Sequence, residues 1–326
     1  MKRLNILLAL CMTVLIFSCK QEQKEKTLKL AHALNEQHPV HKGMMEMARI
    51  LEEVSEGQLT MEIYANGQLG QERDLLELLQ IGSLDMTKVS VGALENFVPE
   101  MKVLTLPYIF RDSAHTWSVL QGPIGKKLLA KGESYWLRGL CFYDAGSRSF
   151  YSKAKPILSP EDLSGMKIRV MNSQSAFDMV NALGGSPTPV SFGELYTALQ
   201  QGVVDGAENN APSFYTSRHY EVCKFYSIDE HSTIPDVLIA STYLWKKLNE
   251  QEREWLQEAA DRSVFYQKEV WAESVQESLK KVTAAGVEIF YPEKSPFQAK
   301  VNGLYSAFDS KPELKELIDD IQNVGK

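Results

Sequence analysis

Two arginines occupy positions where a charged side chain is expected to be buried. Arg169 lies inside the apolar run K-I-R-V-M, and Arg148 lies between a glycine turn and an apolar strand in D-A-G-S-R-S-F. A buried guanidinium is costly unless it is paired. Each arginine is therefore expected to have either an Asp or Glu partner within the protein or a ligand carboxylate, which its planar fork binds through two parallel hydrogen bonds.

Amide and carboxylate side chains stand close to the ends of predicted strands and loops. Asn209 and Asn210 follow D-G-A-E, and Glu72 follows the glycine-containing loop N-G-Q-L-G-Q. Such side chains can exchange hydrogen bonds with sugar hydroxyls. They can equally close turns or stabilise a helix N-terminus, so the pattern alone leaves both roles open.

One seven-residue pattern occurs twice. L-Q-I-G-S-L-D at 79–85 and L-Q-Q-G-V-V-D at 199–205 each predict a helix end, a glycine cap and the start of a strand. Three positions after the aspartate stand Lys88 in the first copy and Glu208 in the second. Two α/β units built alike bring the carboxyl ends of their strands to a shared cleft, where open sheets bind ligands. Lys88 and Glu208 are therefore candidate site residues, although the pattern is also a common helix-to-strand junction.

Motifs for catalysis, metal binding or nucleotide binding do not emerge. His38 and His41 are three positions apart, but no third ligand follows at a metal-site spacing, which favours a histidine at a helix N-terminus. His38 is kept as a candidate ligand contact. The chain has no G-x-S-x-G elbow, no P-loop and no G-x-G-x-x-G after a strand. No metal and no cofactor are expected.

The elements that must position these residues alternate along the chain. Strand-like periodicity covers about 27–33, 59–65, 84–89, 167–171, 236–241 and 287–291, and helical spacing covers 39–56, 72–80, 173–183, 194–201 and 250–283. This alternation predicts an α/β fold with mainly parallel sheets. The last of these helices is too long for one compact layer and is expected to bend or to cross between domains.

Length and composition exclude several classes of protein. The chain has 326 residues, which predicts two domains or one large one. Hydrophobic residues make up 44% and charged residues 24%, which excludes a disordered chain, a collagen-like fibre and a polytopic membrane protein. The net charge is −7 and no basic block stands out, so a nucleic-acid partner is not expected.

The first nineteen residues are typical of an export signal. Lys2 and Arg3 precede an apolar stretch that is too short to span a bilayer comfortably. The stretch ends at I-F-S-Cys19, which resembles a bacterial lipobox, so residues 1–18 are predicted as a signal peptide and Cys19 as an acylated anchor. Residues 19–26 would then be a solvated tether. The alternative is an ordinary cleaved signal with an incidental cysteine, and both interpretations export the protein.

Two cysteines remain in the body of the chain. Cys141 and Cys223 each lie in a short strand-like run. Export makes a disulfide chemically possible, and two buried thiols acting as small hydrophobic residues are the alternative.

Five segments together resemble the DctP-type substrate-binding proteins of TRAP transporters. They are Q-L-G-Q-E72, L-P107-Y, D-L-S-G-M-K-I-R169-V-M, G-G-S-P-T-P-V-S-F192 and Q-Q-G-V-V-D205-G-A-E-N209. The resemblance runs from about residue 27 through the long helix. It implies a two-lobe periplasmic-binding-protein fold with hinge strands and a long helix that spans both lobes. Lobe one is expected at 27–145 plus 235–275, and lobe two at 146–234 plus 276–326.

The resemblance also implies roles for individual residues. Arg169 matches the family's carboxylate-binding arginine and Arg148 a second arginine, while Asn209 matches a polar ligand contact. Phe192 matches the aromatic residue that packs on the ligand, and Glu72 the acid after the loop. Departures from the plainer members are Asn210 beside Asn209, Ser147 beside Arg148, and Lys88; these extra polar groups favour a hydroxyl-rich acid such as glucuronate or galacturonate.

The predicted function is a periplasmic, lipid-anchored receptor without enzymatic activity. It would bind a sugar acid and deliver it to a TRAP membrane permease, which uses an ion gradient and no ATP. The alternatives are an exported carbohydrate-acid enzyme, such as a lyase or isomerase, and a periplasmic ligand sensor. An enzyme would need an acid and a base with matched pKa values, and no motif supplies them.

Overall fold

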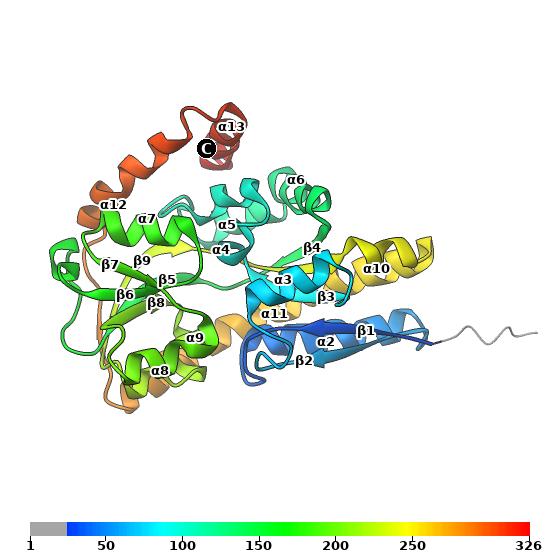
Figure 1. Ribbon diagram of the computed structural model, residues 1–326, viewed down its shortest axis with the longest axis horizontal. Coiled ribbons are helices and arrows are strands. Elements are labelled where there is room, and N and C mark those ends of the chain that lie inside the picture. Colours follow the sequence, from blue (N-terminus) through cyan, green and yellow to red (C-terminus); the bar gives the residue numbers. More distant parts are fainter. Residues whose placement is uncertain (1–24) are drawn as a thin grey trace, which may run out of the picture.

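The computed structural model describes residues 25–326, whose strands form two sheets, each the centre of one lobe (Figure 1). We call lobe one the five-stranded sheet with the helices packed on it, and lobe two the six-stranded sheet with its own helices. The sheet of lobe one has the order β2 (Leu59–Tyr64), β1 (Lys26–Ala31), β3 (Met86–Ser90), β10 (Asp236–Ser241), β4 (Leu137–Tyr143). The sheet of lobe two has the order β11 (Glu288–Phe290), β9 (Phe225–Thr233), β5 (Ser147–Ser152), β8 (Gly206–Asn209), β6 (Lys167–Val170), β7 (Ser186–Pro189).

The predicted α/β fold class is confirmed, and the sheets are mixed rather than parallel throughout. Strands joined through helices run parallel, as β1 does with β2 and β3, and β6 with β7 and β8. Strands β10 and β5 run antiparallel to both of their neighbours. These two strands connect directly to a strand of the other lobe, so no crossover helix returns the chain to a parallel direction.

Short connections form the hinge between the lobes. Strand β4 passes into β5 through residues 144–146, and β9 passes into β10 through residues 234–235. Helix α11 (Glu250–Ala284) is the third connection. It packs on α2 (Pro39–Val54) and β4 of lobe one and on α9 (Ala211–Thr216) of lobe two, so it spans both lobes as expected.

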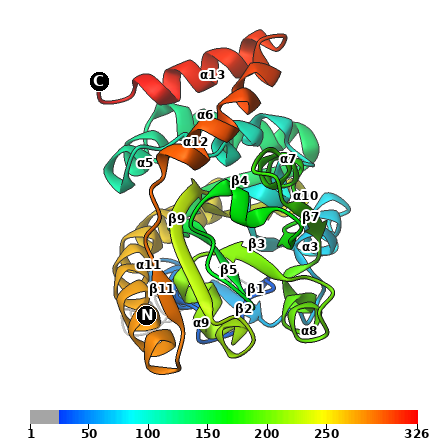
Figure 2. The ribbon, with the colours of Figure 1, turned by 90° about the vertical axis from the view of Figure 1, so that its left-hand side faces the viewer.

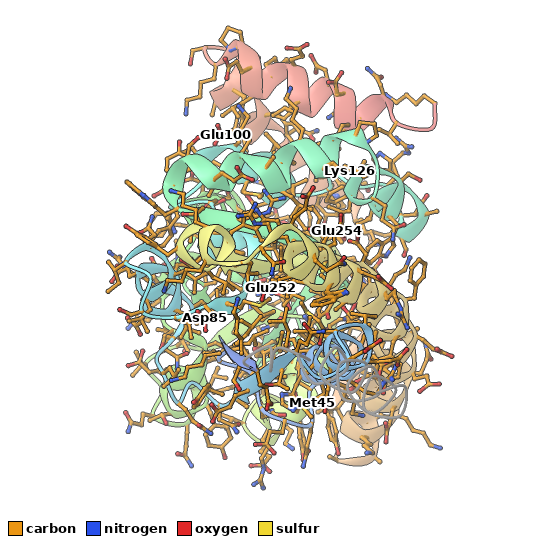
Figure 3. All side chains as sticks on the ribbon, turned by 90° about the vertical axis from the view of Figure 1, so that its right-hand side faces the viewer. Met45, Asp85, Glu100, Lys126, Glu252 and Glu254 are labelled. Atoms are coloured by element: carbon orange, nitrogen blue, oxygen red, sulfur yellow. The ribbon has the colours of Figure 1, made fainter. Side chains whose placement is uncertain are left out.

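Helix α11 holds the hinge by direct hydrogen bonds. Its residue Gln267 accepts from the backbone N–H of Asp144 at 2.7 Å and donates to the carbonyl of Asp144 at 2.8 Å. The start of the helix is fixed by a capping box between Asn249 and Glu252 (Glu252 is labelled in Figure 3), and Glu252 also pairs with Lys26 at 2.6 Å. The helix is therefore tied at one end to lobe one and at its middle to the hinge.

The repeated seven-residue pattern folds alike in both lobes. Gly82 and Gly202 have positive φ angles of 72° and 75°, and each follows the end of a helix. The aspartates then tie neighbouring strands together, because Asp85 accepts from the backbone N–H of Lys29 in β1 and Asp205 from that of Lys167 in β6. Lys88 and Glu208 are thereby placed on corresponding strands, β3 and β8.

Helices cover both sheets, and the last helix lies apart from lobe two. Around lobe one lie α2, α3 (Glu72–Gln80), α4 (Val91–Leu94), η1 (Pro99–Thr105), α5 (Ser113–Leu120), α6 (Pro123–Lys131), η2 (Gly132–Tyr135) and α10 (Thr242–Lys247). Around lobe two lie η3 (Pro160–Leu163), α7 (Gln174–Ala182), η4 (Phe192–Glu194), α8 (Leu195–Gln200), α9 and η5 (His219–Glu221). After β11 come α12 (Ser295–Val301), η6 (Asn302–Phe308) and α13 (Pro312–Asn323). Figure 2 shows this final segment rising from β11 to α13, which packs on α6 and η1 of lobe one.

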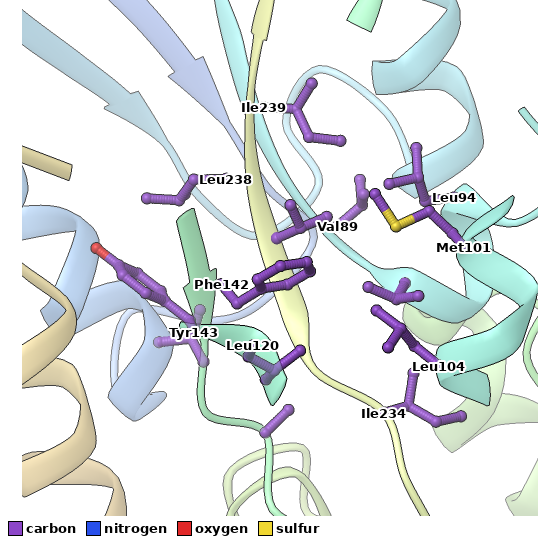
Figure 4. Packing of buried hydrophobic residues seen from close by; sticks show 14 of the residues in the cluster. Val89, Leu94, Met101, Leu104, Leu120, Phe142, Tyr143, Ile234, Leu238 and Ile239 are labelled. Carbon is purple, nitrogen blue, oxygen red and sulfur yellow. The ribbon is translucent and has the colours of Figure 1, made fainter. Parts of the chain in front are cut away.

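The core of lobe one is continuous across its central strands. Val89, Ile239 and Phe142 come from β3, β10 and β4 and lie on the same side of the sheet among neighbouring apolar side chains (Figure 4). Each is at most 3% exposed, so β4 and β10, the lobe-one strands that carry the hinge, belong to a rigid layer.

Cys141 and Cys223 are both free and buried in the structure. They act as small hydrophobic residues, and burial raises the pKa of the Cys223 thiol to about 12. Cys19 lies outside the described residues. Within residues 25–326, none of the helices has the length and apolarity that a membrane span requires.

Candidate functional site

The lobes face each other across a closed cleft. Gly193 N–H donates to Gln71 at 3.1 Å, Asn96 donates to the carbonyl of Asn172 at 2.7 Å, and His38 lies 3.1 Å from Ser213. Each contact joins lobe one to lobe two. Behind the contacts lies a small chamber of about 50 Å³, the inner cavity, which opens toward an outer cleft of about 960 Å³.

Eight of the ten residues predicted as ligand contacts line the inner cavity. They are His38, Glu72, Lys88, Arg148, Arg169, Phe192, Asn209 and Asn210. Side chains that the sequence analysis did not single out complete the wall, including Ser90, Met171, Ser213 and Asp236. Glu72, Arg169 and Phe192 also line the outer cleft and so connect the two spaces.

Arg169 is a buried cation with free donors. Arg169 is 2% exposed, and its Nε donates to the carbonyl of Val190 at 2.8 Å. Within residues 25–326, no carboxylate lies within salt-bridge distance of it, and its two terminal nitrogens make no hydrogen bond. The Phe192 ring lies 6.0 Å from the guanidinium carbon. Burial lowers the pKa of Arg169, but a guanidinium keeps its proton at neutral pH. The two terminal nitrogens, Nη1 and Nη2, are therefore available to bind a carboxylate end-on.

Arg148 has the internal carboxylate partner that the sequence analysis allowed for. Its Nε and Nη2 donate to the two carboxylate oxygens of Glu208 at 2.5 and 2.9 Å, and Nη2 also donates to the Glu208 carbonyl. Nη1 donates to Asn209 at 2.9 Å. Four of the five guanidinium N–H groups are thus used, and one Nη1 hydrogen remains for a ligand.

The predictions for Glu208 and Ser147 as direct contacts are corrected by these positions. Glu208 does not line the inner cavity and instead orients Arg148. Ser147 precedes Arg148 on β5, and successive side chains of a strand point to opposite faces. Its hydroxyl therefore points away from the cavity and donates to Glu230 at 3.0 Å.

Asn209 and Asn210 combine structural and potential binding roles. Asn209 accepts through its side-chain oxygen from Arg148 and from the backbone N–H of Asn210, which leaves its NH2 group available. Asn210 is the N-cap of α9 and donates to the carbonyl of Ala145 at the hinge. The capping role that the sequence left open is therefore real for Asn210.

His38 is also a helix cap. Its Nδ1 accepts from the backbone N–H of Val40, so in the neutral ring Nε2 carries the proton toward Ser213. Burial lowers the pKa of His38 well below its ordinary value, with a smaller contribution from Lys88. A neutral imidazole can join the two lobes without adding charge to the cavity.

Lobe one contributes a cluster of three charges. Lys88 Nζ lies 3.1 Å from Asp236 and 3.5 Å from Glu72, and Glu72 also accepts from the backbone N–H of Ser90 at 2.8 Å. Burial lowers the pKa of Lys88, but the two carboxylates outweigh burial and the net shift is upward. The only sequence signal for Asp236 is an acid directly after I-P, at the start of an apolar strand.

A second buried network supports Arg148 from behind. His231 Nδ1 lies 2.8 Å from Asp229, and its Nε2 lies 3.5 Å from Glu208, at the far limit of a hydrogen bond. Burial lowers the pKa of His231, but the Asp229 and Glu208 carboxylates outweigh burial and raise it to about 9. Burial raises the pKa of Glu208, but Arg148 and His231 together lower it to about 2. The chain Asp229–His231–Glu208–Arg148 thus alternates negative and positive charges.

The arrangement is suited to binding a small ligand and shows no metal centre among the described residues. Among residues 25–326, no group of three or more His, Cys, Asp or Glu side chains is placed to hold a metal ion. The two lobes instead present a guanidinium, amides, a lysine, carboxylates and an aromatic ring to one enclosed space. Such a set fits a small anionic ligand that also carries hydroxyl groups.

Residues 30–311 match the family model of bacterial extracellular solute-binding proteins, family 7 (DctP). A solute-binding protein of Chromohalobacter salexigens is 36% identical over 288 residues, which cover 88% of this chain and 86% of the relative. A TRAP periplasmic solute-binding protein of Xanthobacter autotrophicus, solved with bound β-D-galacturonate, is similar with a TM-score of 0.88 and 40% identity; the match covers 90% of this chain and 99% of that one. One from Roseobacter denitrificans, solved with β-D-glucuronate, has a TM-score of 0.89 and 36% identity, covering 91% and 99%.

The His231 network predicts a specific pH dependence of stability. Because the folded pKa of about 9 exceeds the unfolded value near 6.5, the protonated imidazole stabilises the fold below pH 6.5, and this contribution is lost as the pH rises through 9. We expect the free energy of unfolding to fall by on the order of 2–3 kcal/mol between pH 6.5 and 9, and His231→Gln to flatten this fall. Urea denaturation at four pH values measures it.

The other buried histidines serve as an internal control for this experiment. The pKa values of His32 and His219 are lowered to about 3, chiefly by burial. These rings are neutral in the folded chain throughout the measured window, and in the unfolded chain they become neutral within about one pH unit above 6.5, so they contribute no slope between about pH 7.5 and 9. An unchanged fall in the His231→Gln variant would show that another group is responsible.

Proposed function

This chain belongs to the DctP family of bacterial extracellular solute-binding proteins and is a solute receptor of a TRAP transporter, and we propose that its solute is a hexuronate, glucuronate or galacturonate. The observation that carries the proposal is the buried guanidinium of Arg169, whose terminal nitrogens have no partner within residues 25–326 and line an enclosed cavity. Leaving such a cation unpaired is costly, so a bound carboxylate stabilises the closed protein.

The lobe-two side of the cavity is suited to one carboxylate and one ring. Arg169 offers two parallel donors, and the remaining Nη1 hydrogen of Arg148 and the NH2 group of Asn209 lie on the same wall. Phe192 offers an apolar face beside Arg169. A six-carbon sugar acid supplies the carboxylate for the arginine and a C–H face for the ring.

The lobe-one side is suited to hydroxyl groups. Glu72 and Asp236 offer carboxylate oxygens, and Ser90 offers a hydroxyl, that a short, unsubstituted acid would leave unsatisfied. The solved relatives from Xanthobacter autotrophicus and Roseobacter denitrificans, which hold galacturonate and glucuronate, support the same class of ligand. Arg169, Arg148, Asn209, Phe192, Glu72, Lys88, Asn210 and His38 are the proposed contacts.

The proposed receptor binds and releases its acid without changing it. Apart from Arg169, whose guanidinium keeps its proton, and the neutral ring of His38, the ionisable groups of the cavity are held in ion pairs, as Lys88 is with Asp236 and Glu72 and as Arg148 is with Glu208. A general acid or base needs a proton that it can exchange near neutral pH. Groups committed to such pairs are suited to binding, and transport is the role of the family's named members.

Ligand capture is proposed to occur by closure of the lobes around the hinge. Sheet membership supports lobe one at 27–145 plus 235–275 and lobe two at 146–234 plus 276–311. We place residues 312–326 with lobe one, because Arg111 donates to the carbonyls of Gln322 and Val324, and His115 contacts that of Ile321. The acid stabilises the closed form only through contacts that it makes with both lobes.

The receptor is further proposed to be periplasmic and anchored by lipid at Cys19. The support is the sequence of residues 1–26, in which a basic start and an apolar stretch end at I-F-S-Cys19 before a polar tether. An anchored receptor would search for ligand next to the permease instead of diffusing away from the membrane.

A ligand panel tests the uronate proposal. Glucuronate or galacturonate is expected to raise the unfolding free energy by about 2.7 kcal/mol at a ligand concentration of 100 times its dissociation constant. Neutral hexoses are expected to have no effect, because they leave the Arg169 guanidinium unpaired. Thermal-shift measurements with uronates, hexoses, succinate and pyruvate make the comparison. Stabilisation by succinate or pyruvate with none by a uronate would contradict the uronate assignment.

Arg169→Lys tests the carboxylate contact. Lysine keeps the charge but offers a point donor in place of the planar fork, so we expect uronate affinity to fall at least tenfold, and Arg169→Ala to cost on the order of 2–5 kcal/mol of binding. Isothermal titration calorimetry measures both. Arg49→Lys is the matched control, since Arg49 is exposed and pairs only with Glu46 and Glu53 on its own helix. Near-wild-type affinity for either Arg169 variant would assign Arg169 a structural role.

Cys19→Ser tests the anchor. The wild-type protein is expected to fractionate with membranes and to carry lipid on its mature N-terminus, whereas the serine variant should be recovered in the soluble fraction. Mass spectrometry of the mature N-terminus identifies the modification. A wild-type product that is cleaved elsewhere and free of lipid would exclude this anchor.

A further inference from the structure

Opposite charges are divided between the two walls of the inner cavity. On lobe two, Arg169 stands without a partner beside the Arg148–Glu208 pair, which gives that wall a formal charge of +1. On lobe one, Lys88 faces both Asp236 and Glu72, which gives that wall a formal charge of −1. The acid that binds Arg169 therefore meets a positive wall at one end and a negative wall at the other.

The negative wall keeps free acceptor atoms. Asp236 bonds Lys88 through Oδ2, and Glu72 bonds Lys88 and Ser90 through Oε1. Neither Oδ1 of Asp236 nor Oε2 of Glu72 accepts a hydrogen bond from any residue between 25 and 326. Both residues line the cavity. These oxygens can accept hydrogen bonds from ligand hydroxyls, and an ionised carboxylate has no hydrogen to donate to a second carboxylate.

We infer that Asp236, acting with Glu72, is a specificity-determining residue that restricts the receptor to acids with a single carboxylate. This inference rests on the proposed function, because it assumes that the ligand carboxylate binds Arg169. A hydroxyl end donates to the free carboxylate oxygens. A second carboxylate would instead be brought against a wall of net negative charge in a cavity of about 50 Å³, which disfavours that ligand.

The place of Asp236 in the fold explains why its charge acts on the cavity. It is the first residue of β10, directly after hinge residues Ile234 and Pro235, and it stands opposite Ser90 of β3 in the antiparallel register. Side chains directly opposite in such a pair lie on the same face of the sheet. Asp236 is 6% exposed, so bulk water screens its charge only weakly.

Asp236→Asn removes the negative charge of the Asp236 side chain and keeps its shape. The amide has nearly the same size and keeps an oxygen that Lys88 can bond, while Glu72 remains as the charged partner of the lysine. The lobe-one wall then becomes formally neutral. Glu72→Gln makes the same change of charge at the other carboxylate, and Glu62→Gln makes it on the exposed surface of lobe one, away from the cavity.

Isothermal titration calorimetry with matched open-chain acids measures how well the receptor discriminates between acids with one and with two carboxylates. The pairs are galactonate with galactarate and D-erythronate with meso-tartrate, in which only the second member has two carboxylates. Galacturonate is titrated alongside to test the proposed function. We expect wild type and Glu62→Gln to prefer the single-carboxylate member of each pair, and Asp236→Asn and Glu72→Gln to raise the relative affinity for the dicarboxylate at least tenfold.

The outcomes separate the two proposals. Unchanged discrimination in both cavity variants, with galacturonate still bound, overturns the role of Asp236 and leaves the uronate assignment intact. Wild type that binds dicarboxylates as well as their partners also overturns it. Wild type that binds D-erythronate or galactonate but no uronate overturns the proposed solute, while the change in discrimination still decides the role of Asp236.

Discussion

A guanidinium buried without a carboxylate partner is the constraint on which the rest of this binding site depends. Arg169 is 2% exposed, and its only hydrogen bond within residues 25–326 is to the carbonyl of Val190. The protein thus carries a desolvation cost that a bound acid can offset. The carboxylates of the site do not offset this desolvation cost, because Glu208 pairs with Arg148, and Asp236 and Glu72 pair with Lys88.

Because the site is divided between two lobes joined by a hinge, a ligand bound at Arg169 can act on the positions of the lobes. The arginines belong to strands of lobe two, whereas Lys88, Glu72 and Asp236 belong to lobe one, so no single lobe contains a complete site. The lobes are joined by two short strand connections and by α11, whose Gln267 clamps the backbone of Asp144. A ligand held between the lobes therefore acts directly on the elements that set their distance.

A network of charged side chains behind the cavity holds Arg148 in position. Arg148 is oriented by Glu208, which lies beside His231, which is held in turn by Asp229. Alternating charges of this kind offset the cost of burying each member, provided that all of them are present. The network fixes Arg148 in place and leaves Arg169 as the cation of the cavity that has no carboxylate partner among residues 25–326.

The local sequence was sufficient for the elements and for the most conspicuous site residues. Periodicity and glycine caps located the strands β1, β2, β3, β6, β10 and β11 and the helices α2, α3, α7, α8 and α11, because these depend on neighbours within a few positions. Arg169 was recognisable because an arginine inside an apolar run demands a partner. Asn209 and Glu72 were candidates from their positions after a predicted strand and a glycine-containing loop, and the family segments added Phe192; all three line the inner cavity.

Only the tertiary structure decided which charges pair and which way side chains point. Asp236 meets Lys88 across 148 positions of sequence, and Glu208 meets Arg148 across 60, so the register between strands selects each partner from 42 acidic residues. Ser147 was predicted at the cavity, but the alternation of β5 turns it to the opposite face from Arg148. The sequence predicted that Arg148 and Arg169 are buried cations. Only the packing of the strands determined that Arg169 is the one without a carboxylate partner among residues 25–326, because pairing depends on distances that no local pattern encodes.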